Sequence, residues 1–224
     1  MKVKVIIPAS GRGVRFGSTT PKQFLKIEGR EIIVRTIEKF HSIKLIDEII
    51  ISTKSEYFVE LNNLIKKNKF SKVKKVVEGG KLRQDSVYNA LLHLECSADD
   101  IILVHDAVRP FISPKKITEL IKEAVKVKCV IPGLPVTETV KKVNKKNEVV
   151  TTVDRNGLWT IQTPQAFTYD VLKKSFEKAY KEKFTGTDES SIVENAGYKV
   201  KVINGEIGNI KITLKEDLKG RATT

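Results

Sequence analysis

The chain has 224 residues, 40% of them hydrophobic and 30% charged, an ordinary globular balance that suits one core but not two large domains. Its longest apolar runs are strand-sized and no apolar signal region follows Met1, so we expect a cytoplasmic protein with no membrane contact. The formal net charge is +14, but the lysines are spread along the chain without interleaved aromatic residues, which favours small polyanionic substrates over nucleic acid.

Short β-rich runs alternate with helical patterns through the first three quarters of the chain. Lys2–Ile7 is almost continuously Val and Ile, which is typical of a central parallel strand buried on both faces. Further strands are predicted at Glu48–Ser52, Lys74–Val77, Ile101–His105 and Cys129–Ile131. Helices are predicted at Glu31–Phe40, Tyr57–Ile65, Gln84–Leu94 and Lys116–Val127. This alternation predicts a doubly wound α/β sheet.

The pattern changes after Pro132. The segment Pro135–Thr163 is rich in Val and Thr with alternating character, and Asn144–Asn147 forms a polar turn within it. We therefore expect one domain over residues 1–224, with residues 135–163 as a projecting β-hairpin arm. An isolated hairpin is marginally stable in water, so we expect the arm to pack on a second copy of the chain in a homodimer.

The end of the chain is predicted to combine helices and strands. Helices are predicted at Tyr169–Lys181, Glu189–Asn195 and, beginning a last helix, Lys215–Leu218. Strands are predicted at Lys199–Ile203 and Asn209–Thr213. The second of these strands would place Lys211 between apolar neighbours, where a lysine needs an anionic partner.

A glycine-rich loop follows the first predicted strand, where open α/β sheets bind their ligands. It reads Pro-Ala-Ser-Gly-Arg-Gly-Val-Arg-Phe-Gly from Pro8, and Pro-Lys-Gln follows from Pro21. Glycines let backbone N–H groups approach phosphate oxygens closely, and Arg12, Arg15 and Lys22 add positive charge. Because Phe16 stands where a dinucleotide fingerprint needs Gly, and no Gly-Lys-Ser/Thr follows, the loop is neither of the two common phosphate loops.

Asp106 follows the apolar strand predicted at Ile101–His105, and so belongs at the mouth of the same cleft. A carboxylate there is suited to Mg²⁺, although a turn residue paired with Arg109 is the alternative. His105 is given no role. The pair Gly79-Gly80 joins a strand to a helix and allows close approach to a base or ribose, although a plain loop with a helix cap would explain it.

Three further positions are candidates for substrate contacts. Arg155 lies between an Asp and a turn-forming Asn-Gly, which suggests a fixed position rather than a free surface charge. Thr187 or Asp188 caps a predicted helix, and a helix N-terminus can bind a substrate phosphate.

Cys96 and Cys129 are far apart and form no Cys-x-x-Cys pair, so we expect two free thiols and no zinc site.

These segments, in this order from Val3 to Leu218, resemble the 2-C-methyl-D-erythritol 4-phosphate cytidylyltransferase family. The strings that carry the resemblance are Pro-Ala-Ser-Gly-x-Gly-x-Arg with Pro-Lys-Gln, Val-His-Asp-Ala-Val-Arg-Pro, Pro-Val-Thr-Glu-Thr-Val-Lys, Thr-Val-Asp-Arg-Asn-Gly-Leu-Trp, Gln-Thr-Pro-Gln-Ala-Phe, Thr-Asp-Glu-Ser-Ser and Asn-Ile-Lys-Ile-Thr. The resemblance implies a Rossmann-like nucleotidyltransferase sheet and a homodimer joined by the arm. It also implies transfer of CMP from CTP to methylerythritol phosphate, with Mg²⁺, by in-line attack.

The resemblance also implies roles for individual residues. Catalytic cations are expected at Arg15, Lys22, Arg155 and Lys211. Nucleotide contacts are expected at Ala9, Ser10, Gly11, Gly13, Gly80 and Ser86. Substrate contacts are expected at Asp106, Arg109, Thr137, Arg155, Thr187 and Lys211, with Asp106 also holding the metal. Thr137 and Arg155 are expected to reach the partner subunit's site from the arm.

Two positions depart from the family pattern. Ser10 stands where a second Ala is usual, and Lys81 replaces a common acidic residue, which removes a side-chain acceptor near the base or ribose. Three alternatives stay open: ribitol 5-phosphate as the substrate, a nucleotide-binding protein that has lost catalysis, and a nucleic-acid-binding role.

Overall fold

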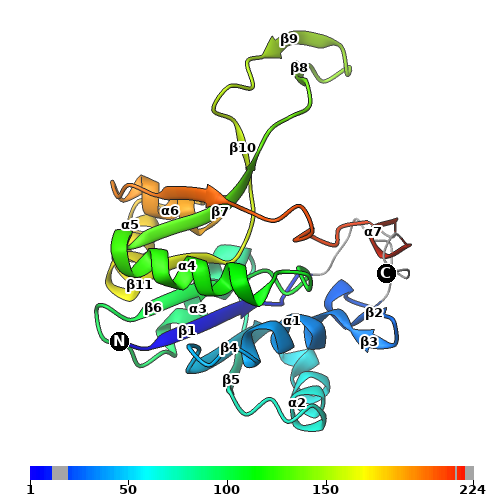
Figure 1. Ribbon diagram of the computed structural model, residues 1–224. Helices are drawn as coiled ribbons and strands as arrows, with labels where there is room; N and C mark the ends of the chain where they lie inside the picture. Colours follow the sequence, from blue (N-terminus) through cyan, green and yellow to red (C-terminus); the bar gives the residue numbers. More distant parts are fainter. Residues whose placement is uncertain (12–19, 215, 220–224) are drawn as a thin grey trace.

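The computed structural model describes residues 1–11, 20–214 and 216–219. Within these residues, eight strands form one mostly parallel sheet in the order β10-β7-β11-β6-β1-β4-β5, with β12 paired to β7 (Figure 1). Its strands are β1 (Val3–Pro8), β4 (Glu48–Thr53), β5 (Val73–Glu78), β6 (Ile101–Val104), β7 (Cys129–Pro135), β10 (Trp159–Ile161), β11 (Gln165–Thr168) and β12 (Lys201–Asn204). The predicted α/β class with a Rossmann-like sheet is therefore confirmed.

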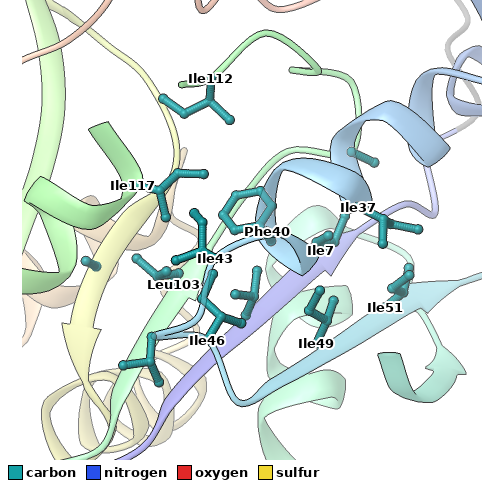
Figure 2. Close-up of a cluster of buried hydrophobic side chains, with 14 of the residues drawn as sticks. Ile7, Ile37, Phe40, Ile43, Ile46, Ile49, Ile51, Leu103, Ile112 and Ile117 are labelled. Atoms are coloured by element: carbon teal, nitrogen blue, oxygen red, sulfur yellow. The ribbon is translucent and has the colours of Figure 1, made fainter. Parts of the chain in front are cut away.

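The central strands are buried on both faces, which explains their almost continuous apolar sequence. In β1, Val5 and Ile7 belong to one hydrophobic cluster, whereas Ile6 between them belongs to the cluster on the other face. β4 alternates in the same way, with Ile49 and Ile51 on the side of Ile7. Figure 2 shows this first cluster, in which Phe40 packs among isoleucines from the strands and from neighbouring segments.

The helices cover the two faces of the sheet in two groups. The cluster that contains Ile7 is closed by α1 (Ile32–His41), α2 (Phe58–Lys67) and α4 (Pro114–Val127). The cluster that contains Ile6 is closed by α3 (Arg83–Leu92), α5 (Tyr169–Lys181) and α6 (Glu189–Asn195). The result is a sheet between two helical layers, as the predicted alternation requires.

The direction of the strand order reverses at β1. The chain moves from β1 outward to β4 and β5, and then returns to place β6 on the other side of β1, parallel to it. In open α/β sheets the crevice at such a switch point lies beyond the carboxyl ends of the two strands. Here those ends lead into Ala9 and His105, so the fold places the loop after Pro8 beside the loop that contains Asp106.

An arm leaves the sheet after β7. Strands β8 (Val140–Val143) and β9 (Val149–Val153) form a separate two-stranded sheet, and Figure 1 shows them projecting away from the body of the molecule. Asn147, in the predicted turn, has a φ of 61° and donates its N–H to the Asn144 carbonyl. Val149 and Val150 on β9 are 61% and 59% exposed, so the arm buries little apolar surface within its own chain.

The prediction of a strand at Asn209–Thr213 is wrong. This segment is irregular, because side chains from elsewhere take carbonyl groups that a strand would offer to a neighbour. Arg109 Nη1 donates to the Asn209 carbonyl (2.7 Å), and Lys22 Nζ donates to the Ile212 carbonyl (3.3 Å). We call residues 209–213 the strap, since they connect the loop that contains Arg109 to the segment that contains Lys22.

The described chain also contains two short 3-10 helices, η2 (Lys22–Phe24) and η3 (Ser55–Tyr57), and three other small elements. Strands β2 (Lys26–Ile27) and β3 (Arg30–Glu31) pair with each other beside α1, and neither was predicted. Helix α7 (Glu216–Lys219) lies where the last helix was expected. No helix in the described ranges is both long and apolar enough to span a membrane.

Candidate active site

A cleft of about 390 Å³ lies beyond the carboxyl ends of β1 and β6, a volume typical of small-molecule sites. It is lined by Pro8, Ala9, Ser10, Gly11, Lys22, Gln23, Gly80, Lys81, Leu82, Arg83, Ser86, Asp106, Ala107, Val108 and Lys211. These residues come from the end of β1 and the loop after it, the 3-10 helix at Lys22–Phe24, the loop before α3 and the first turns of that helix, the loop after β6, and the strap. The structure therefore brings eight of the sequence-predicted site residues to one cleft: Ala9, Ser10, Gly11, Lys22, Gly80, Ser86, Asp106 and Lys211.

The loop after β1 is fixed by backbone contacts to its neighbours. The Ala9 N–H donates to the Ser52 carbonyl (2.7 Å), and the Ala9 carbonyl accepts from Gln23 Nε2 (2.6 Å). Ser10 Oγ donates to the same Ser52 carbonyl (3.2 Å). Gly13 and Arg15, with Arg12, lie outside the described residues, so the glycine turn is described only as far as Gly11.

The Gly79-Gly80 loop packs directly against this turn. A Cβ on Gly79 would lie 1.7 Å from Ser10 Oγ, and a Cβ on Gly80 would lie 2.1 Å from Asp85 Cβ, so both positions require glycine. The Gly80 N–H donates to Ser86 Oγ (3.1 Å), which joins the two predicted nucleotide contacts directly. The loop is thus built by close backbone approach, and it leads directly into α3.

Asp106 lies among three cations. Its Oδ2 is 2.8 Å from Lys211 Nζ and 3.6 Å from Arg109 Nε, and its Oδ1 is 3.0 Å from Arg83 Nε. Burial by itself raises the pKa of Asp106, but Arg83 and Lys211 overcome it and hold that pKa well below its usual range. The carboxylate is therefore ionised, and the predicted anionic partner of Lys211 is Asp106.

Arg83 and Glu189 form a buried ion pair that the sequence did not reveal. Arg83 Nη1 lies 2.6 Å from Glu189 Oε1, and the Glu189 side chain is 0% exposed. Burial raises the pKa of Glu189, and the opposite effect of Arg83 does not fully offset it. Burial alone would lower the pKa of Arg83, but Glu189 and Asp106 together raise it. One signal was available: Arg83 begins α3, where the helix dipole disfavours a cation that has no anionic partner.

The strap connects the two sides of the cleft. The Ile212 N–H donates to the Val108 carbonyl (2.9 Å), and the Ile212 carbonyl accepts a hydrogen bond from Lys22. Arg109 does not line the cleft but holds the start of the strap through Asn209. The predicted position of Lys211 in the middle of a strand was wrong, yet the strap places its ammonium group at Asp106.

Three predicted site residues lie away from this cleft in the single chain. Thr187 is exposed and precedes the N-cap Asp188 of α6, its own N–H donating to Ser191 Oγ (3.0 Å). Arg155 Nη1 donates to the carbonyl of Thr137 at the base of the arm. The arm residues thus contact each other and none of them lines the cleft of their own chain.

The donor set of the cleft can be tested against Mg²⁺. Asp106 is the one carboxylate among its lining residues, and the described part of the chain has no cluster of three or more His, Cys, Asp or Glu groups. Mg²⁺ in nucleotide sites commonly uses one or two carboxylates together with phosphate oxygens, and a single carboxylate fits that mode. The surrounding cations make a metal ion favourable here only together with an anionic triphosphate.

The two cysteines take no part in this site. Both are free, as predicted, and burial raises the pKa of Cys96 and of Cys129 to about 11. Both thiols are therefore protonated at neutral pH and are poor nucleophiles. The chemistry that the cleft supports is that of cations acting on anionic ligands.

The chain is similar to known proteins over almost its whole length. The family model described as IspD, 2-C-methyl-D-erythritol 4-phosphate cytidylyltransferase, matches residues 3–222. The curated protein of that name from Dictyoglomus thermophilum is 45% identical over 219 residues, which cover 97% of this chain and 94% of the relative. The one from Clostridioides difficile is 44% identical over 217 residues, covering 96% of this chain and 90% of the relative.

Solved structures give the same result. The crystal structure of 2-C-methyl-D-erythritol 4-phosphate cytidylyltransferase from Francisella tularensis has a TM-score of 0.84 and 35% identity, with 97% of each chain covered. That of 4-diphosphocytidyl-2C-methyl-D-erythritol synthase from Anaerococcus prevotii has a TM-score of 0.83 and 31% identity, covering 97% of this chain and 92% of the other. The similarity therefore extends over almost the whole chain.

Proposed function

Because the chain belongs to the 2-C-methyl-D-erythritol 4-phosphate cytidylyltransferase family, we propose that the cleft between β1 and β6 is its active site. The activity is that of a nucleotidyltransferase of isoprenoid biosynthesis: CMP passes from CTP to methylerythritol phosphate, giving CDP-methylerythritol and pyrophosphate. The observation that supports this placement best is the meeting of Lys22, Lys211 and Asp106 at the switch point of the sheet. That is where an open α/β sheet binds a nucleotide.

The reaction joins two anions, and this decides what the residues must do. A phosphate oxygen of methylerythritol phosphate forms a bond to the α-phosphorus of CTP, in line with the bond that breaks. The electron pair of the broken bond leaves with pyrophosphate. A phosphate monoester has a second pKa of about 6, so the nucleophile is already anionic and needs no strong general base. The barrier is largely one of charge and orientation, which cations lower.

Most of the roles proposed for individual residues are argued from the positions of the residues at the cleft, whereas those of Gly13, Arg15 and Thr187 come from the family pattern alone. In our proposal the loop after β1, with Ala9, Ser10, Gly11 and Gly13, binds the triphosphate, and Gly80 and Ser86 bind the cytidine. Lys22 and Arg15 neutralise the charge that grows on the α-phosphate and on pyrophosphate. Lys211, Arg109 and Thr187 place methylerythritol phosphate on the side of Asp106.

Mg²⁺ is part of the proposal because the donor set fits it. Asp106 would hold the ion beside the triphosphate. When bound, Mg²⁺ would neutralise phosphate charge next to the reacting α-phosphorus. Lys211 has a side chain that is 42% exposed, so it can turn from Asp106 to a substrate phosphate, while Arg83 and Arg109 stay beside the buried carboxylate.

The arm suggests that the active unit is a homodimer. We propose one domain over residues 1–224, in which residues 135–163 pack on a second copy and bring Thr137 and Arg155 to the partner subunit's cleft. Two observations support this arrangement: Thr137 and Arg155 do not line the cleft of their own chain, and Val149 and Val150 are exposed. We also propose that the enzyme acts in the cytoplasm, and that neither nucleic acid nor a membrane is a partner.

One assay tests the substrate assignment. Pyrophosphate release is measured with each of four NTPs, crossed with methylerythritol phosphate and ribitol 5-phosphate, in the presence of Mg²⁺. We expect release only with CTP and methylerythritol phosphate. Turnover of ribitol 5-phosphate alone would reassign the substrate, and no release with any pair would support a binding protein without catalysis.

A further inference from the structure

We propose that His105 is a positioning residue for the reaction proposed above: it closes a circuit of hydrogen bonds that fixes the loop carrying Asp106 behind the cleft. His105 follows β6 and is 0% exposed. Its ring packs against Phe40, with ring centroids 4.8 Å apart, as an ordinary core residue would. Unlike a core aromatic residue, however, it uses both ring nitrogens, and both contacts lead to the active site.

The circuit passes through four residues from three segments of the chain. His105 Nε2 lies 3.0 Å from the Arg109 carbonyl oxygen, and Arg109 Nη1 donates to the Asn209 carbonyl (2.7 Å). Asn209 Nδ2 donates to the Thr163 carbonyl (2.8 Å), and Thr163 Oγ1 lies 3.1 Å from His105 Nδ1. Each residue therefore contacts the next, and the last contacts the first.

The chemistry of the groups determines which atoms donate and which accept the hydrogen bonds of this circuit. A carbonyl oxygen only accepts, so His105 Nε2 must carry the proton toward Arg109, which leaves Nδ1 of the neutral ring as an acceptor. The Thr163 hydroxyl then donates to Nδ1, and its lone pair accepts the Asp106 N–H (3.1 Å).

The circuit supports one side of the cleft more than the other. It holds the backbone of Asp106 through Thr163, and it holds the strap through Asn209, two residues before Lys211. The glycine turn at Gly11 and the Gly79-Gly80 loop are not members. We therefore expect the circuit to set the position of the groups that receive methylerythritol phosphate. CTP is also bound, in our proposal, by the glycine turn and by Gly80 and Ser86, which lie outside the circuit, so its binding should depend on the circuit much less.

The test compares the kinetics of three histidine variants. His105→Phe keeps a ring against Phe40 but removes both hydrogen bonds, so kcat/KM for methylerythritol phosphate should fall about tenfold or more, with KM for CTP changed less than about threefold. His105→Gln, whose amide nitrogen can still donate to Arg109, should recover part of this loss. His41→Phe is the matched control, because His41 packs on Phe70 (centroids 5.3 Å apart) and does not line the cleft. It should keep wild-type kinetics.

Two results would overturn the inference while leaving the proposed function intact. One is wild-type kinetics in His105→Phe, and the other is an equal loss for both substrates, which a general loss of structure would give. If His105→Phe does not fold, the inference is decided by His105→Gln, in which kcat/KM for methylerythritol phosphate should fall more than KM for CTP changes. If the wild-type chain itself does not turn over methylerythritol phosphate, the proposed function fails, and this inference fails with it.

Discussion

Lys211 Nζ lies 2.8 Å from Asp106 Oδ2, although one residue belongs to the strap and the other to the loop after β6. Arg83 and Arg109 approach the same carboxylate. Without its negative charge these cations would repel one another. We therefore expect Asp106 to act as a resident anion that keeps the cations assembled until the phosphates of the substrates arrive.

This role predicts how Asp106→Asn behaves. Removing the charge leaves three cations facing an amide, so we expect the free energy of unfolding to fall by about 3 kcal/mol. We expect kcat to fall by at least about 10²-fold. Asp170→Asn is the matched control for stability, since the Asp170–Lys174 pair is exposed and its loss should cost less than about 0.5 kcal/mol. Chemical denaturation of both variants checks the difference; equal small losses would contradict the role.

The same carboxylate predicts a pH dependence. Its pKa in the folded chain lies below the ordinary value of about 3.9, so its contribution to stability is fully present above that value and is lost as the pH falls below it. The difference in free energy of unfolding between wild type and Asp106→Asn should be constant above about pH 5 and shrink below about pH 4. A difference that stays constant down to about pH 3 would show that the cations do not stabilise the ionised form.

Close packing across the cleft predicts a compensating pair of substitutions. Gly79→Ala should raise KM for CTP by about tenfold, because its Cβ would displace Ser10 and with it the loop that we propose binds the triphosphate. Ser10→Gly removes the atoms that lie closest to that Cβ, at 1.7 and 2.8 Å. The double variant should therefore regain part of the lost affinity. If the effects of Gly79→Ala and Ser10→Gly on KM for CTP simply add, contact with Ser10 is not the reason why position 79 needs glycine.

Lys22 should act on the chemical step. Lys22→Ala should lower kcat by about 10²-fold or more while the circular dichroism spectrum and melting temperature stay close to wild type. Arg15→Ala is expected to do the same on the basis of the family pattern. Lys26→Ala is a suitable control, since Lys26 is 61% exposed and does not line the cleft. Near-wild-type turnover of both Lys22→Ala and Arg15→Ala would reject their assignment.

The proposed exchange of arms predicts complementation between subunits. Asp106→Asn damages the cleft of its own chain, whereas Arg155→Ala damages the arm that serves the partner. Each variant alone should be nearly inactive. After equal amounts are mixed and allowed to exchange, half of the dimers are mixed and each has one intact site, so about a quarter of wild-type activity should appear. If each chain completed its own site, mixing would restore nothing.

The sequence predicted the architecture well because the signals there are local. The almost continuous apolar run of β1 and the polar turn at Asn144–Asn147 each carry their own pattern, and the structure confirms both. The cleft could also be located, because a loop rich in glycine and cations follows the first strand. These predictions needed no knowledge of which distant residues would meet.

The predictions that failed depend on contacts between residues that are far apart in the sequence. The strap alternates Ile210 and Ile212 with polar residues and so imitates a strand, but Arg109 and Lys22 bind its carbonyl groups from far away in the sequence. The pairing of Arg83 with Glu189 and the circuit through His105 were missed for the same reason. Each joins segments whose proximity is a property of the fold rather than of any local pattern.

A crystal structure of the complex with CTP and Mg²⁺ tests the central claim most directly. We predict the triphosphate against Gly11 and Lys22, with the metal ion about 2.0–2.1 Å from an Asp106 carboxylate oxygen and Lys211 turned toward the nucleophile's site. A triphosphate bound away from the glycine turn, or a metal ion remote from Asp106, would contradict the account.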